Sequence, residues 1–318
     1  MKRFGSARPV SAILFVLLFA LLGVTLAPAL PGCVPSRSAW KGGGDLSPVT
    51  IYLCTDDFAY LAPVTVEVPG GNALRESVRL VVEWPGGGPF LSPFPPGSKL
   101  RSLEVDGVVA RVRVSAGAGA WDESRRASAR EALAWTLTGF PEIKRVSLDA
   151  GSGDRGAEPR PPFINHTGPA PWDGSMKLIL WFAYKGTYLV PVTKFVPRSA
   201  FPHSSALQQL IAGPPEGGTL ARTLPEGTRL LAVSVERGTC TVDVSPGPSQ
   251  AQPSGGTEAG GTEALALQSM VLTLTEFLDV QAVRVLVDGK AGATLGGHVI
   301  LDTPMKRGIV NSVYPGAD

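Results

Sequence analysis

The chain has few of the residues from which most enzyme sites are built. It contains three cysteines and three histidines among 318 residues. Its 29 basic residues nearly balance its 27 acidic residues, so there is no large charge excess that would attract nucleic acid. Glycine and proline are common instead, with 38 and 29 residues. At 44% hydrophobic residues the chain can bury a core, but loops must interrupt it often.

The spacings that mark catalytic and metal sites are also missing. No histidine pair has the HxxxH spacing, and His166, His203 and His298 have no cysteine nearby, so the sequence supports no metal site. There is no GxSxG motif for a serine nucleophile. Asp56 and Asp57 are adjacent and would point in opposite directions along an extended chain, which argues against a catalytic acid pair. We therefore predict a protein without catalytic residues, metal or cofactor.

The N-terminus has the pattern of an export signal. Lys2, Arg3 and Arg8 precede an apolar run at residues 12–26, which is shorter than the about 20 residues of a membrane span. The motif Leu30-Pro31-Gly32-Cys33 follows it. It resembles the lipobox of bacterial lipoproteins, in which a small residue precedes a cysteine that is lipidated and becomes the new N-terminus.

We therefore expect a signal peptide at residues 1–32, lipidation of Cys33 and a flexible tether at residues 33–47. Two alternatives stay open: cleavage at Ala27-Pro28-Ala29, or an apolar run that remains as an anchor. All three place the rest of the chain outside the cytoplasm, and the favoured one fixes it to the outer face of the cytoplasmic membrane. Cleavage before Cys33 removes three of the 29 basic residues, which leaves 26 against 27 acidic residues and a formal charge of −1.

One hexapeptide occurs twice, as YLAPVT from Tyr60 and as YLVPVT from Tyr188. Proline lacks the N–H that a strand ladder needs, so its repetition inside an apolar stretch is unusual. The match extends over three blocks in the same order: residues 49–69 with 177–197, 95–115 with 225–245, and 136–148 with 273–285. Three ordered blocks indicate a duplicated domain.

Both copies predict the same order of elements: two extended segments, a short helix, a hairpin, a longer helix and a last strand. Pro63 is expected at a strand edge or bend. In copy one the signals are Leu74, Val78 and Val81 for the short helix, Asp106-Gly107 for the hairpin turn, Ala129, Leu133, Leu137 and Phe140 for the longer helix, and residues 145–148 for the last strand. In copy two they are Leu207, Leu210 and Ile211 for the short helix, Glu236-Arg237-Gly238 for the turn, Ala266, Met270, Leu274 and Phe277 for the longer helix, and residues 283–287 for the last strand.

This order predicts an α+β fold of two tandem α/β sandwich domains, each a small mixed sheet with helices on one face. We place the first domain, copy one, at residues 48–150 and the second, copy two, at residues 176–304. Between them we expect a linker at residues 151–175, and after them a C-terminal tail at residues 305–318.

Three smaller features receive structural interpretations. Residues 246–261 are of low complexity and are expected to be disordered. Asn165-His166-Thr167 matches a glycosylation sequon, but we interpret it as plain linker. Cys54 and Cys240 lie in different copies, so we interpret them as small buried hydrophobes on strands and not as a disulfide.

The repeated hexapeptide has two interpretations. Its edge could accept a partner strand or subunit, because it combines proline with aromatic and β-branched residues. Alternatively its tyrosine and leucine pack in the core, and the proline protects the edge against unwanted pairing. We favour the second.

Copy two contains a series of motifs within residues 177–304: YLVPVT, LIAGPPEGG, LPEGTRLLAVSVERGTCTVDVS, EALALQSMVLTLTE, VRVLVDGK and LGGHVILDTP. In this order they resemble the GerMN domain of the GerM family of spore germination lipoproteins. Copy one resembles a divergent GerMN domain: it has EWPGGG where the family has AGPPE, and it lacks LGGH. His298 lies in the LGGH motif and has two interpretations. It could contact a ligand or, as we favour, be a histidine at a strand start that hydrogen-bonds a loop.

The resemblance implies a fold similar to the ring-building modules of sporulation channels and secretion systems. It also implies a non-enzymatic envelope lipoprotein that serves as a scaffold or adaptor for envelope or sporulation proteins, with homo-oligomers as a further option. Alternatives are an envelope enzyme or regulator acting on peptidoglycan, a partner of a membrane sensor kinase, and a two-lobed solute-binding lipoprotein.

Overall fold

The computed structural model describes residues 45–115, 117, 121–151, 156–247, 257–295, 297 and 299–316. The predicted signal peptide, Cys33, most of the predicted tether and His298 lie outside these residues. Residues 43–318 belong to one compact unit. Within the described ranges, no helix has the length and apolar character that crossing a membrane requires.

Copy one begins with an antiparallel sheet. Strand β1 (Leu46–Thr55) pairs along its length with β2 (Leu61–Pro69), and the short β3 (Phe90–Leu91) pairs with the other side of β1. The order β2-β1-β3 leaves β2 at an edge. Pro63 therefore lies in an edge strand, as predicted, where its missing N–H breaks no ladder within this sheet.

The other strands of copy one form a mixed sheet. Its order is β4 (Lys99–Asp106), β5 (Val109–Ser115), β6 (Arg145–Asp149) and β7 (Glu158–Pro159), and only β5 and β6 run parallel. The β4–β5 turn lies one residue later than predicted, at Gly107-Val108, because Asp106 pairs with Val109. Gly107 has φ 58°, which suits the first position of a tight hairpin turn.

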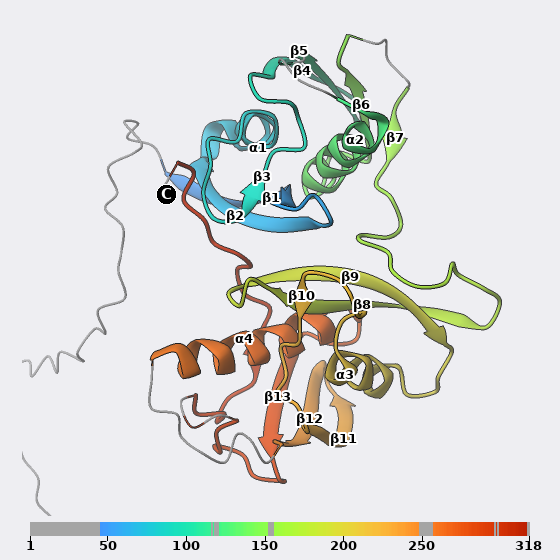
Figure 1. Cartoon of the computed structure of the whole chain (residues 1–318), viewed down its shortest axis with the longest axis vertical. Helices are drawn as coiled ribbons and strands as arrows, with labels where there is room; N and C mark the ends of the chain where they lie inside the picture. Colours follow the sequence, from blue (N-terminus) through green and yellow to red (C-terminus); the bar gives the residue numbers. More distant parts are fainter. Residues whose placement is uncertain are drawn as a thin grey trace, which may run out of the picture. The chain divides into compact units, whose positions relative to one another are not determined.

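Two helices lie between these sheets. Helix α1 (Ala73–Val82), which follows a short 3₁₀ turn (Gly70–Asn72), and helix α2 (Glu123–Leu137) both contact β1 on one side and the mixed sheet on the other (Figure 1). The Asp122 side chain caps α2 by accepting a hydrogen bond from the Arg125 N–H. Each copy thus has the predicted mixed sheet with helices on one face, and an additional antiparallel sheet covers the helices from the other side.

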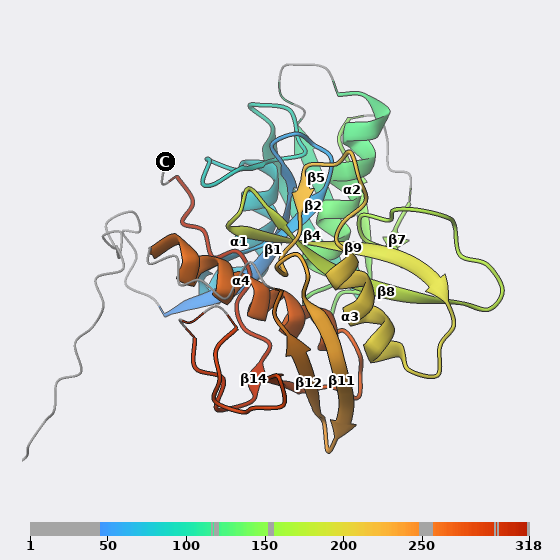
Figure 2. The ribbon, with the colours of Figure 1, turned by 60° about the horizontal axis from the view of Figure 1, so that its bottom comes forward.

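Copy two repeats the arrangement. Its sheets have the orders β10-β8-β9 and β11-β12-β13-β14, and α3 and α4 lie between them (Figure 2). The elements are β8 (Ser175–Tyr184), β9 (Tyr188–Pro197), α3 (Pro202–Ala212), β10 (Leu220–Ala221), β11 (Arg229–Glu236), β12 (Thr239–Ser245), α4 (Thr257–Leu274), β13 (Ala282–Val287) and β14 (Met305–Lys306).

Two predictions about helices need correction. Helix α4 begins at Thr257, so the last five residues of the segment that we expected to be disordered are helical, and residues 248–256 lie outside the described residues. The longer helices end at Leu137 and Leu274. Phe140 and Phe277 therefore lie beyond the helices whose stripe we expected them to continue, although both still pack against the core.

The two cysteines of the described residues behave as predicted. Cys54 on β1 and Cys240 on β12 are buried and form no disulfide. Burial raises the pKa of each thiol to about 12. Both are therefore neutral, packed side chains and not reactive thiols.

Candidate functional site

The repeated hexapeptide lies at a contact between the two copies. Asn165, in the predicted linker, is one of two bridging residues. Its side-chain amide donates hydrogen bonds to the carbonyl oxygens of Leu61 and Pro191, each at 2.7 Å, and its oxygen accepts from the Leu61 N–H at 2.8 Å. One side chain thus joins the edge strand β2 of copy one to the edge strand β9 of copy two.

Asn311, in the C-terminal tail, makes the mirror set of bonds. Its amide donates to the carbonyl oxygens of Leu189 and Pro63, each at 2.8 Å, and its oxygen accepts from the Leu189 N–H at 2.8 Å. The two asparagines have φ values of 47° and 48°, a left-handed conformation that asparagine tolerates better than most residues. The leucine and proline of each hexapeptide are therefore held by equivalent contacts.

The hexapeptide threonines bind the same two segments. The Thr65 N–H donates to the carbonyls of Val310 and Asn311, each at 3.2 Å, and the Thr65 carbonyl accepts from the Val313 N–H at 3.1 Å. In copy two, the Thr193 N–H donates to the Ile164 carbonyl at 3.0 Å, and the Thr193 carbonyl accepts from the Thr167 N–H at 3.0 Å. The segment after copy one thus adds to the edge of copy two, and the segment after copy two adds to the edge of copy one. Part of the predicted linker and part of the predicted tail consequently belong to the folded interface.

The hexapeptide tyrosines each reach into the opposite copy. The ring of Tyr188 packs edge-on against Phe90, with ring centroids 4.9 Å apart. A Cβ added to Gly88 would lie 2.9 Å from the Tyr188 hydroxyl oxygen, and a Cβ added to Gly218 would lie 2.9 Å from that of Tyr60. In the glycine-rich loop after Trp84, Gly88 therefore leaves room for a side chain of the other copy.

These contacts refine the interpretation of the hexapeptide. Leu61 and Leu189 are buried, as the favoured interpretation required. The strand edges that carry the hexapeptides, however, do accept a partner. That partner is the other domain copy within the same molecule. Buried apolar residues of both copies accordingly belong to one continuous cluster.

Asp56 and Asp57 bind different partners and do not form an acid pair. Asp56 accepts hydrogen bonds from the Tyr184 hydroxyl and the Lys185 ammonium group, and these bonds hold the pKa of Asp56 below its usual value. Asp57 accepts from the hydroxyls of Thr55 at 2.6 Å and Thr219 at 2.7 Å. The turn of copy one thus contacts the turn of copy two.

Replacing Asp56 with asparagine should lower the melting temperature at neutral pH. The pKa of Asp56 in the folded protein lies below the ordinary value of 3.8, so its contribution is complete above that value and is lost as the pH falls through the folded pKa. Melting curves of the wild type and of Asp56→Asn should therefore converge in acid. Asp45→Asn, which removes an exposed carboxylate elsewhere, is the control; a difference that persists unchanged at the lowest pH would contradict this assignment.

A cavity at the contact between the copies combines aromatic and charged residues. It has a volume of about 650 Å³, and a neighbouring cavity of about 490 Å³ shares several of its lining residues. The shared residues are Tyr52, Trp135, Arg160, Trp181 and Arg307. Burial raises the pKa of Tyr52 to about 12, so its hydroxyl stays protonated. Such a lining can bind a ligand but offers no nucleophile paired with a base.

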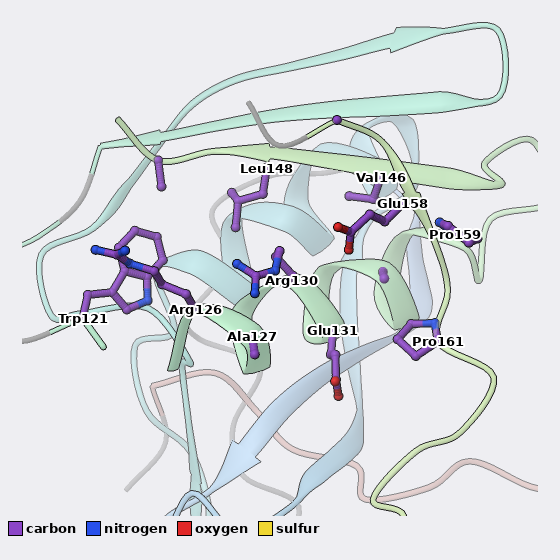
Figure 3. Close-up of a pocket in the computed structure, with 13 residues that line it drawn as sticks. Trp121, Arg126, Ala127, Arg130, Glu131, Val146, Leu148, Glu158, Pro159 and Pro161 are labelled. Atoms are coloured by element: carbon purple, nitrogen blue, oxygen red, sulfur yellow. The ribbon is translucent and has the colours of Figure 1, made fainter. Parts of the chain in front are cut away.

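A smaller cavity of about 210 Å³ lies inside copy one, between α2 and the strands β6 and β7 (Figure 3). Burial raises the pKa of its Glu131. Figure 3 shows Glu131 pointing away from Glu158, the other carboxylate of the lining, so the two do not face each other as an acid–base pair would. Arg126 lies over the Trp121 ring, 5.5 Å from its centroid.

Copy two holds a loop against the equivalent helix. Thr136 aligns with Thr273, so Arg126 corresponds to Glu263 on α4. The buried Glu263 carboxylate accepts hydrogen bonds from the backbone N–H groups of Leu295, at 2.8 Å, and Val299, at 3.1 Å. Leu295 is the first residue of the LGGH motif and Val299 directly follows the motif, whose His298 lies outside the described residues. Copy one lacks both the LGGH motif and this carboxylate, because it has Arg126 at the position of Glu263.

The other histidines have structural partners. His166 contacts the Pro169 carbonyl at 3.1 Å and packs against Phe195. His203 contacts Asp279 at 3.1 Å and packs against Phe277. In the part of the chain that the structure describes, no group of three or more His, Cys, Asp or Glu side chains is placed to hold a metal ion.

Comparison with known proteins identifies the two copies. The family model Germane, described as sporulation and spore germination, matches residues 50–152 and 179–293. The tandem GerMN domains of the sporulation protein GerM from Bacillus subtilis align with a TM-score of 0.62 at 20% identity, over 84% of this chain and 99% of that chain. The first GerMN domain of the same Bacillus subtilis protein aligns over 42% of this chain and 98% of that chain, at 24% identity and a TM-score of 0.33. Among curated proteins, no significant match was found.

The two matched regions coincide with the two copies of the fold, and the solved tandem domains share this fold. The resemblance inferred from the motifs is thereby confirmed. This chain belongs to the Germane family of sporulation and spore germination proteins and carries two tandem GerMN domains of the GerM type.

Proposed function

We propose that this protein is a non-enzymatic adaptor of the bacterial envelope, which presents its two GerMN domains to other envelope proteins as one unit. The observation that carries the proposal is the reciprocal contact between the copies. Asn165 and Asn311 each bind both copies, and each post-domain segment completes the edge of the opposite copy. A fixed pair of domains can offer a composite surface to a partner without ordering cost on binding.

In this proposal the protein is lipidated at Cys33 and held on the outer face of the cytoplasmic membrane. The lipobox-like motif and the apolar run before it support this location. The family description supports a role in sporulation or germination. A membrane-held adaptor meets its partners at a high local concentration, so modest affinity for each partner is sufficient.

Crosslinking and capture from native membranes test the proposal. The full chain and the Cys33→Ala variant would be compared in growing and in sporulating cells. The proposal expects envelope proteins of the sporulation stage to be captured by the wild type and lost with the anchor. Capture of a sensor kinase or of cell-wall enzymes from growing cells would instead indicate a general envelope role, and failure to capture any envelope protein would contradict an adaptor.

A further inference from the structure

Arg160 and Arg307 hold equivalent positions in the two copies. Each follows the last short strand of its mixed sheet, and β7 and β14 pair in the same register with β6 and β13. Each guanidinium lies over an indole ring, Arg160 over Trp135 at 4.6 Å and Arg307 over Trp181 at 5.3 Å. Stacking on an indole fixes the guanidinium plane and leaves its N–H edge available for an anion.

The two arginines differ in their partners. Arg307 forms an ion pair with Glu276 at 2.9 Å and donates to the Thr275 hydroxyl at 3.2 Å. In the aligned blocks the counterpart of Glu276 is Gly139. Copy one therefore lacks the carboxylate. Among the described residues Arg160 has no ion pair or hydrogen bond, and its guanidinium lies over the Trp135 ring.

The space beside Gly139 is part of the cavity system at the contact between the copies. Gly139, Trp135 and Arg160 all line the cavity of about 490 Å³, and Trp135 and Arg160 also line the cavity of about 650 Å³. The Trp135 indole N–H is buried and has no hydrogen-bond partner among the described residues. The exposed Arg160 thus borders an open space at the position where copy two has a carboxylate.

We propose that the two adjoining cavities beside Arg160 bind an acidic peptide segment. A carboxylate of this peptide would pair with Arg160 as Glu276 pairs with Arg307. The inference rests on the proposed adaptor role and names the chemistry of its partner. The larger cavity is also lined by the cations Lys177 and Arg307 against the single carboxylate of Glu276, which favours an anion. Leu278, fully exposed at its rim, and Pro162 give apolar contacts, so the acidic residue is flanked by apolar ones.

The binding test uses the purified full chain and a blocked peptide with one glutamate, acetyl-Leu-Thr-Glu-Phe-Leu-amide. Its affinity would be followed by tryptophan fluorescence and compared with that of the same peptide with glutamine. Loss of one charge-assisted pair corresponds to at least about tenfold weaker binding. We expect this loss both for the glutamine peptide and for Arg160→Gln, whereas Arg198→Gln, at an exposed arginine outside these cavities, should bind normally.

Gly139→Glu supplies the missing carboxylate inside the chain. The φ of Gly139 is not positive, so its backbone suits a residue with a side chain, and the added Cβ, 3.1 Å from the Thr136 carbonyl oxygen, requires a small shift. This variant should keep its melting temperature and lose peptide binding, because its own glutamate occupies Arg160. Unchanged melting with unchanged peptide binding would overturn the proposal.

The remaining outcomes are also decisive. Equal affinity for the glutamate and glutamine peptides, or equal effects of Arg160→Gln and Arg198→Gln, would overturn the carboxylate site. Binding of N-acetylmuramic acid but not of the peptide would assign the site to a glycan and overturn a peptide partner. Membrane capture separates this inference from the adaptor role: envelope partners that Gly139→Glu still captures would leave the adaptor intact and reject this site.

Discussion

Replacing Asn311 with alanine should lower the free energy of unfolding by about 2–4 kcal/mol, because three backbone groups of two strands lose their partner at once. These are the N–H and carbonyl of Leu189 and the carbonyl of Pro63. Leu189 and Pro63 are buried, so water does not readily replace the lost bonds. Asn165→Ala should cost a similar amount, since its bonds to Leu61 and Pro191 are equivalent.

Chemical denaturation of single variants would measure this loss. Alanine also strains the left-handed backbone at both positions, so Asn311→Gly separates the lost hydrogen bonds from the strain. The third asparagine of the chain, Asn72, makes no capping bond and is exposed, so Asn72→Ala is the matched control. If Asn311→Gly were as stable as Asn72→Ala, the bridge would not be a major contribution to stability.

Replacing Glu263 with alanine should cost about 2–4 kcal/mol, because the backbone N–H groups of the buried Leu295 and the half-buried Val299 lose their charge-assisted hydrogen bonds. The effect should be local: amide hydrogen exchange should accelerate most at Leu295 and Val299, whose N–H groups the carboxylate binds. Glu142→Ala, at an exposed glutamate of copy one, is the control. Uniform acceleration over the whole of copy two, with no excess in this loop, would show that Glu263 supports the core and not the loop.

Periodic patterns of apolar residues predicted most of the helices and strands of the fold. Leu74, Val78 and Val81 indicated α1, and the alternating residues on both sides of Gly107 indicated the hairpin, because these signals repeat along the chain. The split into two sheets was not evident, since alternation shows which face of a strand is buried but not which strands pair. The turn was placed one residue early because Asp106 and Gly107 both tolerate turn conformations, and only the pairing of Asp106 with Val109 decides between the two positions.

The contact between the two copies depends on single residues that belong to no periodic pattern in the sequence. Asn165 lies in a stretch whose proline and glycine content is typical of a linker, so its sequon was interpreted as plain linker. Asn311 lies in what was interpreted as a tail. One signal could have found both: Ile164-Asn165 and Val310-Asn311 each place an apolar residue before an asparagine after the last strand of a copy. A match of two residues is too short to stand out until the structure shows that both bind the hexapeptide.

The contact between the two turns has a consequence for which domains can pair. Asp56 and Tyr184 are equivalent positions of the two copies, and they touch each other. A pair of two first domains from separate chains would therefore bring two Asp56 carboxylates together. A pair of two second domains would place Tyr184 and Lys185 against a second Tyr184, where Asp56 has no counterpart carboxylate. Only a first domain with a second domain places carboxylate against hydroxyl and cation. The different residues in this turn thus favour pairing of a first domain with a second domain. Because both domains belong to one chain, the second domain of the same chain is present at the highest local concentration.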